Sequence, residues 1–497
     1  MALDLSKLRG ISLLDKETNP REIFTLLPNK EQKYQYLRDV QSEVLASWYE
    51  RRGQKDVVLK MNTGGGKTVV GLLLLKSCLN ENVAPAFFVV PDNYLLSQVE
   101  SEARALGIAV ERDPEAASVQ QGNAIGIINI HKLINGFSKF GVGDAGIKLP
   151  IGAVVVDDAH ACLNTTESQF SIEVNNTHEV YRRILELFQD DLKAQNPAQF
   201  LEIEFSDPNP TMLVPFWAWH DKYSQVAKIL SEFKNDDAVK FNWPLIKNDL
   251  LHCRCFIGGV GLEISPRCLP IEAIPSFDNA KRRIFMTATL ADDSILVSDF
   301  KASPESVTKH ITPRSANDIG DRMILAPQEI DPDISENDIR EYLKKKSKNY
   351  NVVVIVGSEF RAESFWKEAA DRICNKDNLE STVKELKAGH VGLVILVNKY
   401  DGIDLPNSAC RILVLDGLPK ARRLSEKVEN TFLGRSRHII GRQVQRIEQG
   451  IGRGVRANDD YCVVFLMGAE LTKVLFFLDA KEMFSPATSA QLKLSFP

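Results

Sequence analysis

Short, nearly continuous apolar runs recur along the chain, and a Gly- or Asp-bearing turn and a helical stretch follow them. In the first half they are DVVLKM, AFFVV, AIGII, IGAVVV and RRIFM (56–61, 86–90, 124–128, 151–156 and 282–286). In the second half they are NVVVIV, VGLVILV, RILVL and CVVFL (351–356, 391–397, 411–415 and 462–466). Such strands suit a parallel sheet covered by helices on both faces, so the pattern predicts an α/β protein.

Residues 164–255 interrupt this rhythm and are more aromatic and helical. The stretch HEVYRRILELF places apolar residues on one helix face: Val180, Ile184, Leu187 and Phe188. SQVAKILSEF repeats the pattern with Val226, Ile229, Leu230 and Phe233. We therefore expect a mainly helical insertion here. Segment 301–350, with several prolines and many charges, is typical of a hinge that leads into a second α/β unit.

The composition is that of a soluble globular protein, with 44% apolar and 26% charged residues among 497. This length predicts two to four domains. The longest apolar runs fall short of the roughly 20 residues that a membrane span needs, and the N-terminus does not resemble a secretory signal. We expect a cytoplasmic protein without a membrane partner. The net charge of −5 argues against a uniformly basic surface but leaves room for a local basic groove.

The strongest chemical signal is MNTGGGKT (61–68), which stands between a predicted strand and the helical run VVGLLLLK. Backbone N–H groups of such a loop can surround phosphate oxygens, and the helix N-terminus favours negative charge. The residues of this cradle are Thr63, Gly64, Gly65 and Gly66. Lys67 would neutralise the β- and γ-phosphates, and the Thr68 hydroxyl would ligate Mg²⁺. The strict pattern has Gly where Met61 stands. ATP and Mg²⁺ are the expected cofactors.

A pair of acids follows another predicted strand, in VVVDDAHA (154–161). A carboxylate at the end of a buried strand is costly unless it meets a cation, so Asp157 is a natural partner for Mg²⁺. Asp158 would orient and deprotonate the attacking water. An acidic turn after a strand is an ordinary feature by itself, but the upstream phosphate loop favours the hydrolytic interpretation.

GGGKT followed by DDAH resembles motifs I and II of superfamily 2 helicases of the DEAD/DEAH-box type, with His160 in the histidine position. Asp158 stands where that family usually has Glu, which shortens the reach of the carboxylate by one methylene. QGIGRGVR (449–456) resembles motif VI and aligns Gln449, Arg453 and Arg456 with it. The resemblance implies that the two arginines, three apart on a helix, reach the γ-phosphate from a second lobe.

Weaker resemblances place four further sites. RRIFMTATL resembles motif III, which implies that Thr287 and Thr289 link the ATP site to the nucleic acid. NKYDGIDLPN resembles motif V and implies nucleotide contacts for Gly402 and Asp404. YQYLRDVQSEVL resembles a Q motif, in which Gln41 would read adenine and Tyr34 or Tyr36 would stack on it. INIHKL lies where motif Ib is expected, with Lys132 on a phosphate. A Thr-rich strand end, an amphipathic helix and a plain strand-to-helix turn are the alternatives.

Within this superfamily the chain is most similar to the Rad3/XPD/DinG-like branch, which carries an arch domain between motifs II and III. Some members hold an iron–sulfur cluster on four cysteines between motifs I and II, where this chain has only Cys78. The resemblance implies two tandem RecA-like P-loop domains. The expected division is an N-terminal extension (1–33), lobe 1 (34–163 and 256–300), a helical arch-like insertion (164–255) and lobe 2 (301–497).

The function that this resemblance implies is an ATP-dependent helicase or translocase on single-stranded nucleic acid, DNA more than RNA. Two alternatives stay open. One is the motor subunit of a phage-defence or restriction complex that contains a separate nuclease. The other is a slow ATP-controlled clamp, because Asp158 is short. Trp217, Trp219 and Lys222 in the insertion would offer a stacking platform for bases, although core packing is the simpler interpretation.

Overall fold

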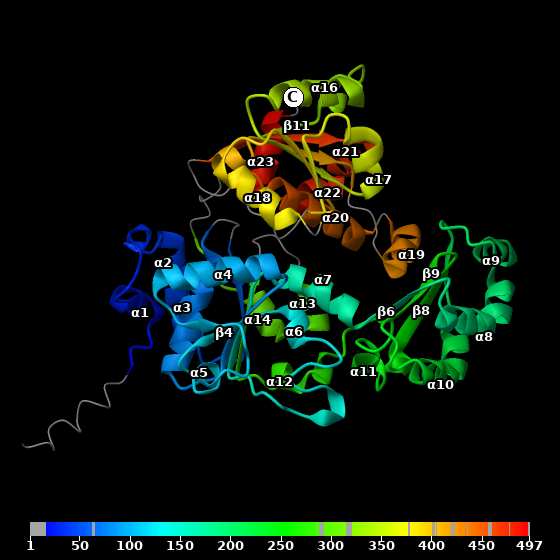
Figure 1. Cartoon of the computed structure of the whole chain (residues 1–497), viewed down its shortest axis with the longest axis horizontal. Coiled ribbons are helices and arrows are strands. Elements are labelled where there is room, and N and C mark those ends of the chain that lie inside the picture. The colour runs from blue at the N-terminus through cyan, green and yellow to red at the C-terminus, as the bar shows by residue number, and fades with distance from the viewer. Residues whose placement is uncertain are drawn as a thin grey trace, which may run out of the picture.

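The computed structural model shows two α/β lobes, one above the other, with an inserted unit beside the first (Figure 1). It describes residues 16–61, 65–287, 293–314, 321–375, 378–399, 403, 405–418, 423–434, 436–455, 460–476 and 478–495. None of the helices within these ranges is both long and apolar enough to cross a membrane.

Lobe 1 is built on a six-stranded parallel sheet. Its order is β1 (Asp56–Lys60), β10 (Arg282–Thr287), β5 (Ala153–Val156), β2 (Ala86–Val90), β4 (Ile125–Asn129) and β3 (Val110–Glu111). One face is covered by α1 (Pro20–Leu26), α2 (Asp39–Arg51), α3 (Lys67–Asn80) and α4 (Asn93–Leu106). The other is covered by α5 (Ala117–Gln120), α6 (Ile130–Leu133), α7 (Ala159–Gln169), α12 (Pro275–Asp278), α13 (Ser294–Asp299) and α14 (Pro304–Thr308).

Lobe 2 repeats this architecture. Its sheet order is β11 (Asp321–Leu325), β16 (Tyr461–Met467), β15 (Ile412–Asp416), β12 (Val352–Val356), β14 (Leu393–Val397) and β13 (Arg372–Cys374). One face carries α18 (Leu379–Ala388), α20 (Arg437–Ile451), α21 (Ala469–Phe476) and α22 (Leu478–Met483). Further helices are α15 (Pro327–Ile330), α16 (Glu336–Lys346), α17 (Glu359–Arg361), α19 (Leu424–Leu433) and α23 (Pro486–Ser495). The prediction of two tandem RecA-like domains is confirmed.

All nine predicted apolar runs form strands of these two sheets. The three lobe strands that the pattern did not predict, β3, β11 and β13, lie at sheet edges or are only two or three residues long. In β11 the side chains alternate between exposed and buried, because only one face of the sheet is covered at this strand. Continuous apolar runs therefore identify the strands that are covered on both faces, including the edge strand β1, and do not identify strands that are very short or half-exposed.

The inserted unit contains the expected helices together with an antiparallel sheet. The helices are α8 (Glu179–Gln195), α9 (Pro197–Glu204), α10 (Phe216–Glu232) and α11 (Trp243–Ile246). The sheet order is β6 (Ile172–Asn175), β9 (Gly261–Pro266), β8 (Cys253–Gly258) and β7 (Thr211–Leu213). The expected boundary between residues 255 and 256 cuts β8, so both strands of the β8–β9 hairpin belong to this unit and not to lobe 1. Both are buried almost throughout and lack the alternation that marks a half-exposed strand.

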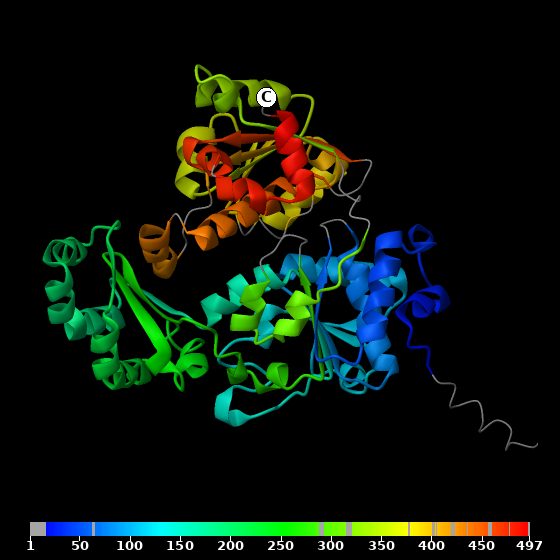
Figure 2. The same ribbon diagram turned by 180° about the vertical axis from the view of Figure 1, so that it is seen from behind.

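The inserted unit shares one hydrophobic core with the α7 face of lobe 1, and Figure 2 shows it from behind. Phe188 of α8 stacks on Trp219 of α10 with ring centroids 6.0 Å apart. The indole of Trp219 donates to the carbonyl of Leu250 at 3.1 Å, and Lys222 pairs with Asp191 at 2.7 Å. Two members of the proposed stacking platform therefore belong to the interior of the unit.

The chain passes between the lobes later than expected. Ile311 still forms a parallel bridge with Leu59 of β1, and β11 of lobe 2 begins at Asp321. The first residues of the segment assigned to lobe 2, up to Ile311, therefore belong to lobe 1. The described part of 301–350 includes α14 on lobe 1, with Pro304 in its first turn, and α16 on lobe 2, with a capping box at Ser335.

Candidate nucleotide site and its connections

Three neighbouring strands of lobe 1 bring the predicted motifs to one edge of the sheet. The strands β1, β10 and β5 are adjacent and parallel, so their C-terminal ends lie side by side. The phosphate loop follows β1, the paired acids follow β5, and Thr287 ends β10. Ligands of open α/β sheets bind at this edge, outside the carboxyl ends of the strands.

Two glycines give the phosphate-loop helix its position. Gly66 caps α3 with a left-handed backbone (φ 75°), and a Cβ there would lie 2.1 Å from Nε2 of Gln41. A Cβ at Gly71 would lie 2.6 Å from the Phe88 ring, so glycine lets the helix lie directly on the sheet. Lys67 and Thr68 form the first turn of α3, whose N–H groups favour an anion. Thr63 and Gly64 lie outside the described residues.

Gln41 supports the phosphate loop from α2. Its Nε2 donates to the carbonyl of Gly66 at 3.3 Å, and its Oε1 accepts from the backbone N–H of Arg38 at 3.0 Å. The residue is buried, so both ends of the amide help to fix the loop. Its predicted contact with adenine stays a prediction. Of the two tyrosines, Tyr36 is exposed, whereas Tyr34 bonds to Glu102, and burial together with that bond raises the pKa of its phenol.

The paired acids occupy different environments at the end of β5. Asp157 is buried and its N–H donates to the carbonyl of Val89 at 2.9 Å. Asp158 has a left-handed backbone (φ 46°), which a non-glycine residue rarely adopts, and its N–H donates to Oδ1 of Asp157 at 3.0 Å. Among the contacts that the structure describes, its carboxylate does not cap α7. The oxygen donors of Thr68 and Asp157 are the ligand type that Mg²⁺ prefers, so these residues fit the ion.

A buried acid that the sequence motifs did not reveal joins the strand ends. Oδ1 of Asp293 lies 2.9 Å from Nε2 of His160, and its Oδ2 lies 2.9 Å from Nζ of Lys60. Thr287 also donates its hydroxyl to Oδ2 at 3.3 Å. The carboxylate accepts from His160, so the Nε2 of this histidine carries a proton. We call these four residues the Asp293 cluster. Thr289 lies outside the described residues.

The helix α20 lies on the side of lobe 2 that points toward lobe 1 (Figures 1 and 2). Gln449 is half-buried near the end of α20. Arg453 is buried in the turn beyond α20, which ends at Ile451, and it donates to the carbonyl of Ile403 at 3.1 Å. The expectation that Arg453 shares a helix face with the second arginine is wrong, because the helix has already ended. Arg456, Gly402 and Asp404 lie outside the described residues.

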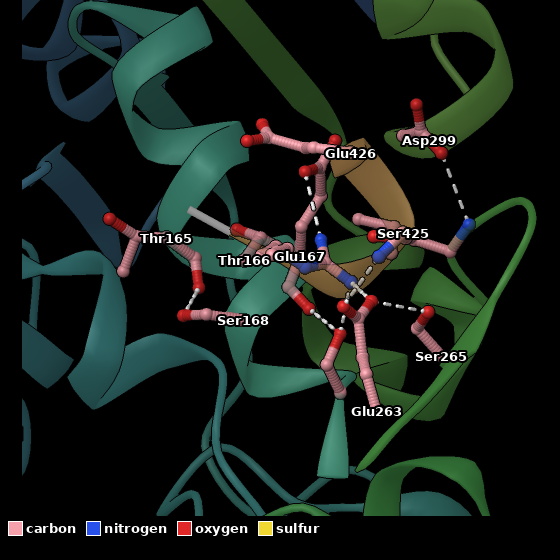
Figure 3. A network of polar contacts seen from close by, with 12 residues as sticks. Thr165, Thr166, Glu167, Ser168, Glu263, Ser265, Asp299, Ser425 and Glu426 are labelled. Carbon is pink, nitrogen blue, oxygen red and sulfur yellow. Dashed lines mark hydrogen bonds and ion pairs between the residues drawn. The ribbon is translucent and has the colours of Figure 1, made fainter. Parts of the chain in front are cut away.

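Lobe 2 contacts both lobe 1 and the inserted unit through Arg423. Arg423, just before α19, places Nη2 2.6 Å from Glu263 of β9 and Nη1 3.1 Å from Glu167 of α7. The backbone N–H of Ser425 donates to the other oxygen of Glu263 at 3.0 Å. Figure 3 shows Glu167, Glu263 and Ser425 converging here. Burial raises the pKa of Glu167, although Arg423 and Arg442 lower it in part. We call Arg423, Glu167, Glu263 and Ser425 the Arg423 cluster.

Lys132 lies at the C-terminal end of β4, on the same sheet edge as the motifs. It is exposed, and its ammonium donates to the carbonyl of Arg112 at 3.0 Å. Nearby, the side-chain amides of Asn129 and Asn93 join the start of α6 to the start of α4 at 2.7 Å. The position leaves Lys132 available to a ligand that crosses this edge.

Comparisons with known proteins agree with this architecture. Residues 35–195 match the family model "Type III restriction enzyme, res subunit", and residues 335–474 match "Helicase C-terminal domain". No curated protein matches the chain. The solved "Structure of S. tokodaii Xpd4" is 18% identical, with a TM-score of 0.56 over 90% of this chain and 99% of that one. A structure titled "XPD_Helicase" is 15% identical, with a TM-score of 0.54 over 92% and 98%. At these identities the likeness shows the fold.

Proposed function

We propose that this chain is a superfamily 2 helicase related to the XPD branch and that it hydrolyses ATP between its lobes to move along single-stranded nucleic acid, with DNA as the expected track. One observation carries the proposal. A single polypeptide holds a phosphate-loop helix on lobe 1 and a buried arginine, Arg453, directly after α20 of lobe 2, and α20 lies on the side of lobe 2 that points toward lobe 1 (Figure 1). Two lobes that grip one nucleotide from opposite sides can convert its hydrolysis into relative motion.

Each residue of lobe 1 has a distinct task in this proposal. The ammonium of Lys67 neutralises the β- and γ-phosphates, and the N–H groups of the first turn of α3 bind their oxygens. Thr68 and Asp157 would hold Mg²⁺, which would offset charge on the phosphate oxygens. Asp158 accepts a hydrogen bond from the attacking water and then its proton.

Lobe 2 completes the site when the lobes close. The guanidinium of Arg453 stabilises the charge that builds on the γ-phosphate, as arginine fingers do. The Ile403 carbonyl orients this side chain from the loop that also carries Gly402 and Asp404, which we assign to the ribose. Lys132, Thr287 and Thr289 are the contacts proposed for transmitting the change to the nucleic acid.

A slow nucleotide-controlled clamp is the second candidate, because Asp158 reaches one methylene less far than Glu. The same sites serve both functions, and the rate of turnover separates them. A nuclease or defence-system partner is not included in the proposal, because the family and structure matches do not bear on it.

The test is ATP turnover with single-stranded DNA, single-stranded RNA and duplex in parallel, using Lys67→Ala as the inactive control. A motor is expected to turn over at least about tenfold faster with one of the single strands, and Lys67→Ala to lose this turnover. Equal rates with and without nucleic acid would contradict the motor. Slow, unstimulated turnover combined with ATP-dependent strand binding would favour the clamp.

A further inference from the structure

A wide groove lies beside the contact between the inserted unit and helix α19 of lobe 2. It holds about 1330 Å³ of open space, with β7, β8 and the start of α10 on one wall and α19 on the other. Both overall views place α19 beside this sheet (Figures 1 and 2). The groove lies away from the nucleotide site, and none of the residues assigned to ATP lines it.

Aromatic side chains stand exposed on both walls of the groove. Phe216 and Trp217 at the start of α10 are 80% and 58% exposed, and their rings meet edge to face at 5.1 Å. Phe432 near the end of α19 is 78% exposed on the other wall. Apolar rings left in water at this density usually mark a binding surface. Aromatic rings on opposite walls of a groove can bind planar ligands by stacking.

The charged lining of the groove favours an anion. It comprises Arg254, Arg267 and Lys427 against one carboxylate, Glu202. Lys427 bonds to the carbonyl of Pro208 at 3.4 Å, and Arg254 lies 3.6 Å from Glu429. The side chain of Arg254 is still 31% exposed, and the cations of the lining outnumber its carboxylate three to one.

We propose that this groove binds single-stranded nucleic acid, with its bases stacked on Phe216, Trp217 and Phe432 and its phosphates near Arg254, Arg267 and Lys427. A single strand matches both the exposed aromatic rings and the cationic side chains of the lining. Each of its unpaired bases can stack on a ring, and each of its phosphates carries a negative charge. The inference rests on the proposed function and adds to it a binding site outside the two lobes. The walls belong to different moving parts, so the hold on the strand changes as the lobes open and close.

The test uses the full chain and measures the anisotropy of a short fluorescein-labelled oligothymidylate, with oligouridylate in parallel. Two variants remove the stacking faces, Phe216→Ala/Trp217→Ala on one wall and Phe432→Ala on the other. Phe205→Ala is the matched control, because Phe205 is 79% exposed on the same unit and does not line the groove. Each groove variant is expected to bind about tenfold more weakly, and the control to bind as the wild type does.

A further variant, Arg267→Ala, tests the phosphate contacts. It is expected to reduce the slope of log affinity against log salt by about one unit. Thermal unfolding of all variants checks that they are folded.

The outcomes separate the groove from the motor. If a single strand stimulates wild-type ATP turnover but all the groove variants bind like Phe205→Ala, the groove proposal is overturned and the motor stands. If no strand stimulates or binds the wild type, both are overturned. A protein that binds the wild type and is released by these variants, while strand binding is unchanged, also overturns the groove proposal.

Discussion

Helix α7 has a buried ionic cluster at each end, and the two clusters differ in what they join. At its start, Asp293 holds His160 together with side chains from two neighbouring strands, all within lobe 1. Near its end, Glu167 meets Arg423 of lobe 2, which also binds Glu263 of the inserted unit. One cluster is internal to a rigid lobe, whereas the other crosses between parts that must move in the proposed cycle.

This difference indicates that the two ends of α7 have different roles in the proposed cycle. Contacts within a lobe persist when the lobes move, so the Asp293 cluster fixes the geometry of the hydrolytic acids. Contacts across the lobes form or break with that motion, so the Arg423 cluster sets how readily the lobes separate. Because α7 begins next to Asp158, a change at either end of the helix can reach the other.

The largest expected effect is at the hydrolytic end. Asp158→Ala removes the carboxylate that we assign as base, so ATP turnover should fall by about 10²- to 10⁴-fold while nucleotide affinity is retained. Single-turnover hydrolysis and binding of a fluorescent ATP analogue measure the two quantities. Normal hydrolysis in this variant would show that another group activates the water.

Asp293→Asn should cost most in stability. The substitution leaves the ammonium of Lys60, whose side chain is only 13% exposed, without its carboxylate at 2.9 Å. Removing one partner of a buried pair typically costs about 3–5 kcal/mol, and urea unfolding would measure the loss. A change below about 1 kcal/mol would mean that the cluster is not a structural hub of lobe 1.

Arg423→Ala should destabilise less, because the buried carboxylate of Glu263 keeps a hydrogen bond after the guanidinium is removed. Glu263, only 1% exposed, keeps the N–H of Ser425 but loses the guanidinium, at an expected cost of about 1–3 kcal/mol. Because Arg423→Ala frees the lobes, it should also change the factor by which nucleic acid stimulates ATP turnover, whereas Asp293→Asn should lower turnover with and without nucleic acid by the same factor. Arg314→Ala, which removes a largely exposed pair with Glu43, serves as control and should change stability by less than about 0.5 kcal/mol. If Arg423→Ala and Asp293→Asn changed stability and ATP turnover in the same way, the proposed difference between the two clusters would be contradicted.

The smallest effect concerns pH. Burial raises the pKa of Glu167 above its ordinary value of 4.5, so the folded chain holds this proton more tightly than the unfolded chain. Its contribution to stability is therefore present below pH 4.5 and is lost as pH rises through the raised pKa. Urea unfolding of wild type and Glu167→Gln across this range should show that loss in the wild type alone. A parallel pH dependence in both would exclude Glu167 as its source.

The covered strands and the phosphate chemistry could be predicted from the sequence, because both depend on contiguous residues. A strand buried on both faces appears in the sequence as a run of apolar residues. The phosphate loop is recognised from GGGKT and the helical residues that directly follow it. Asp293 carries no such signal, since its role exists only when the ends of β1, β5 and β10 meet in space. In the sequence, Asp293 is only the second of two adjacent aspartates that follow the stretch MTATL, and this position alone does not predict its contacts.

The inserted unit was harder to predict for the same reason. Its sheet pairs β6 with β9, strands that lie far apart in the sequence, and the two strands of its hairpin have no amphipathic alternation. Arg423 contacts Glu167, which lies 256 positions earlier in the chain, so no local sequence pattern predicts the contact. The turn that ends α20 before Arg453 also escaped prediction, because QGIGRGVR continues the helical pattern.

The central claim is that both lobes hold one nucleotide, and the distance between them tests it most directly. Spin labels at Arg104 on α4 and Lys384 on α18, in a background where exposed Cys268 is replaced by Ser, report the separation of the lobes. A non-hydrolysable ATP analogue with a single strand should shorten this distance in the wild type. It should leave the distance unchanged in Lys67→Ala and in Arg453→Ala. Equal shortening in Arg453→Ala, or no change in the wild type, would contradict the account.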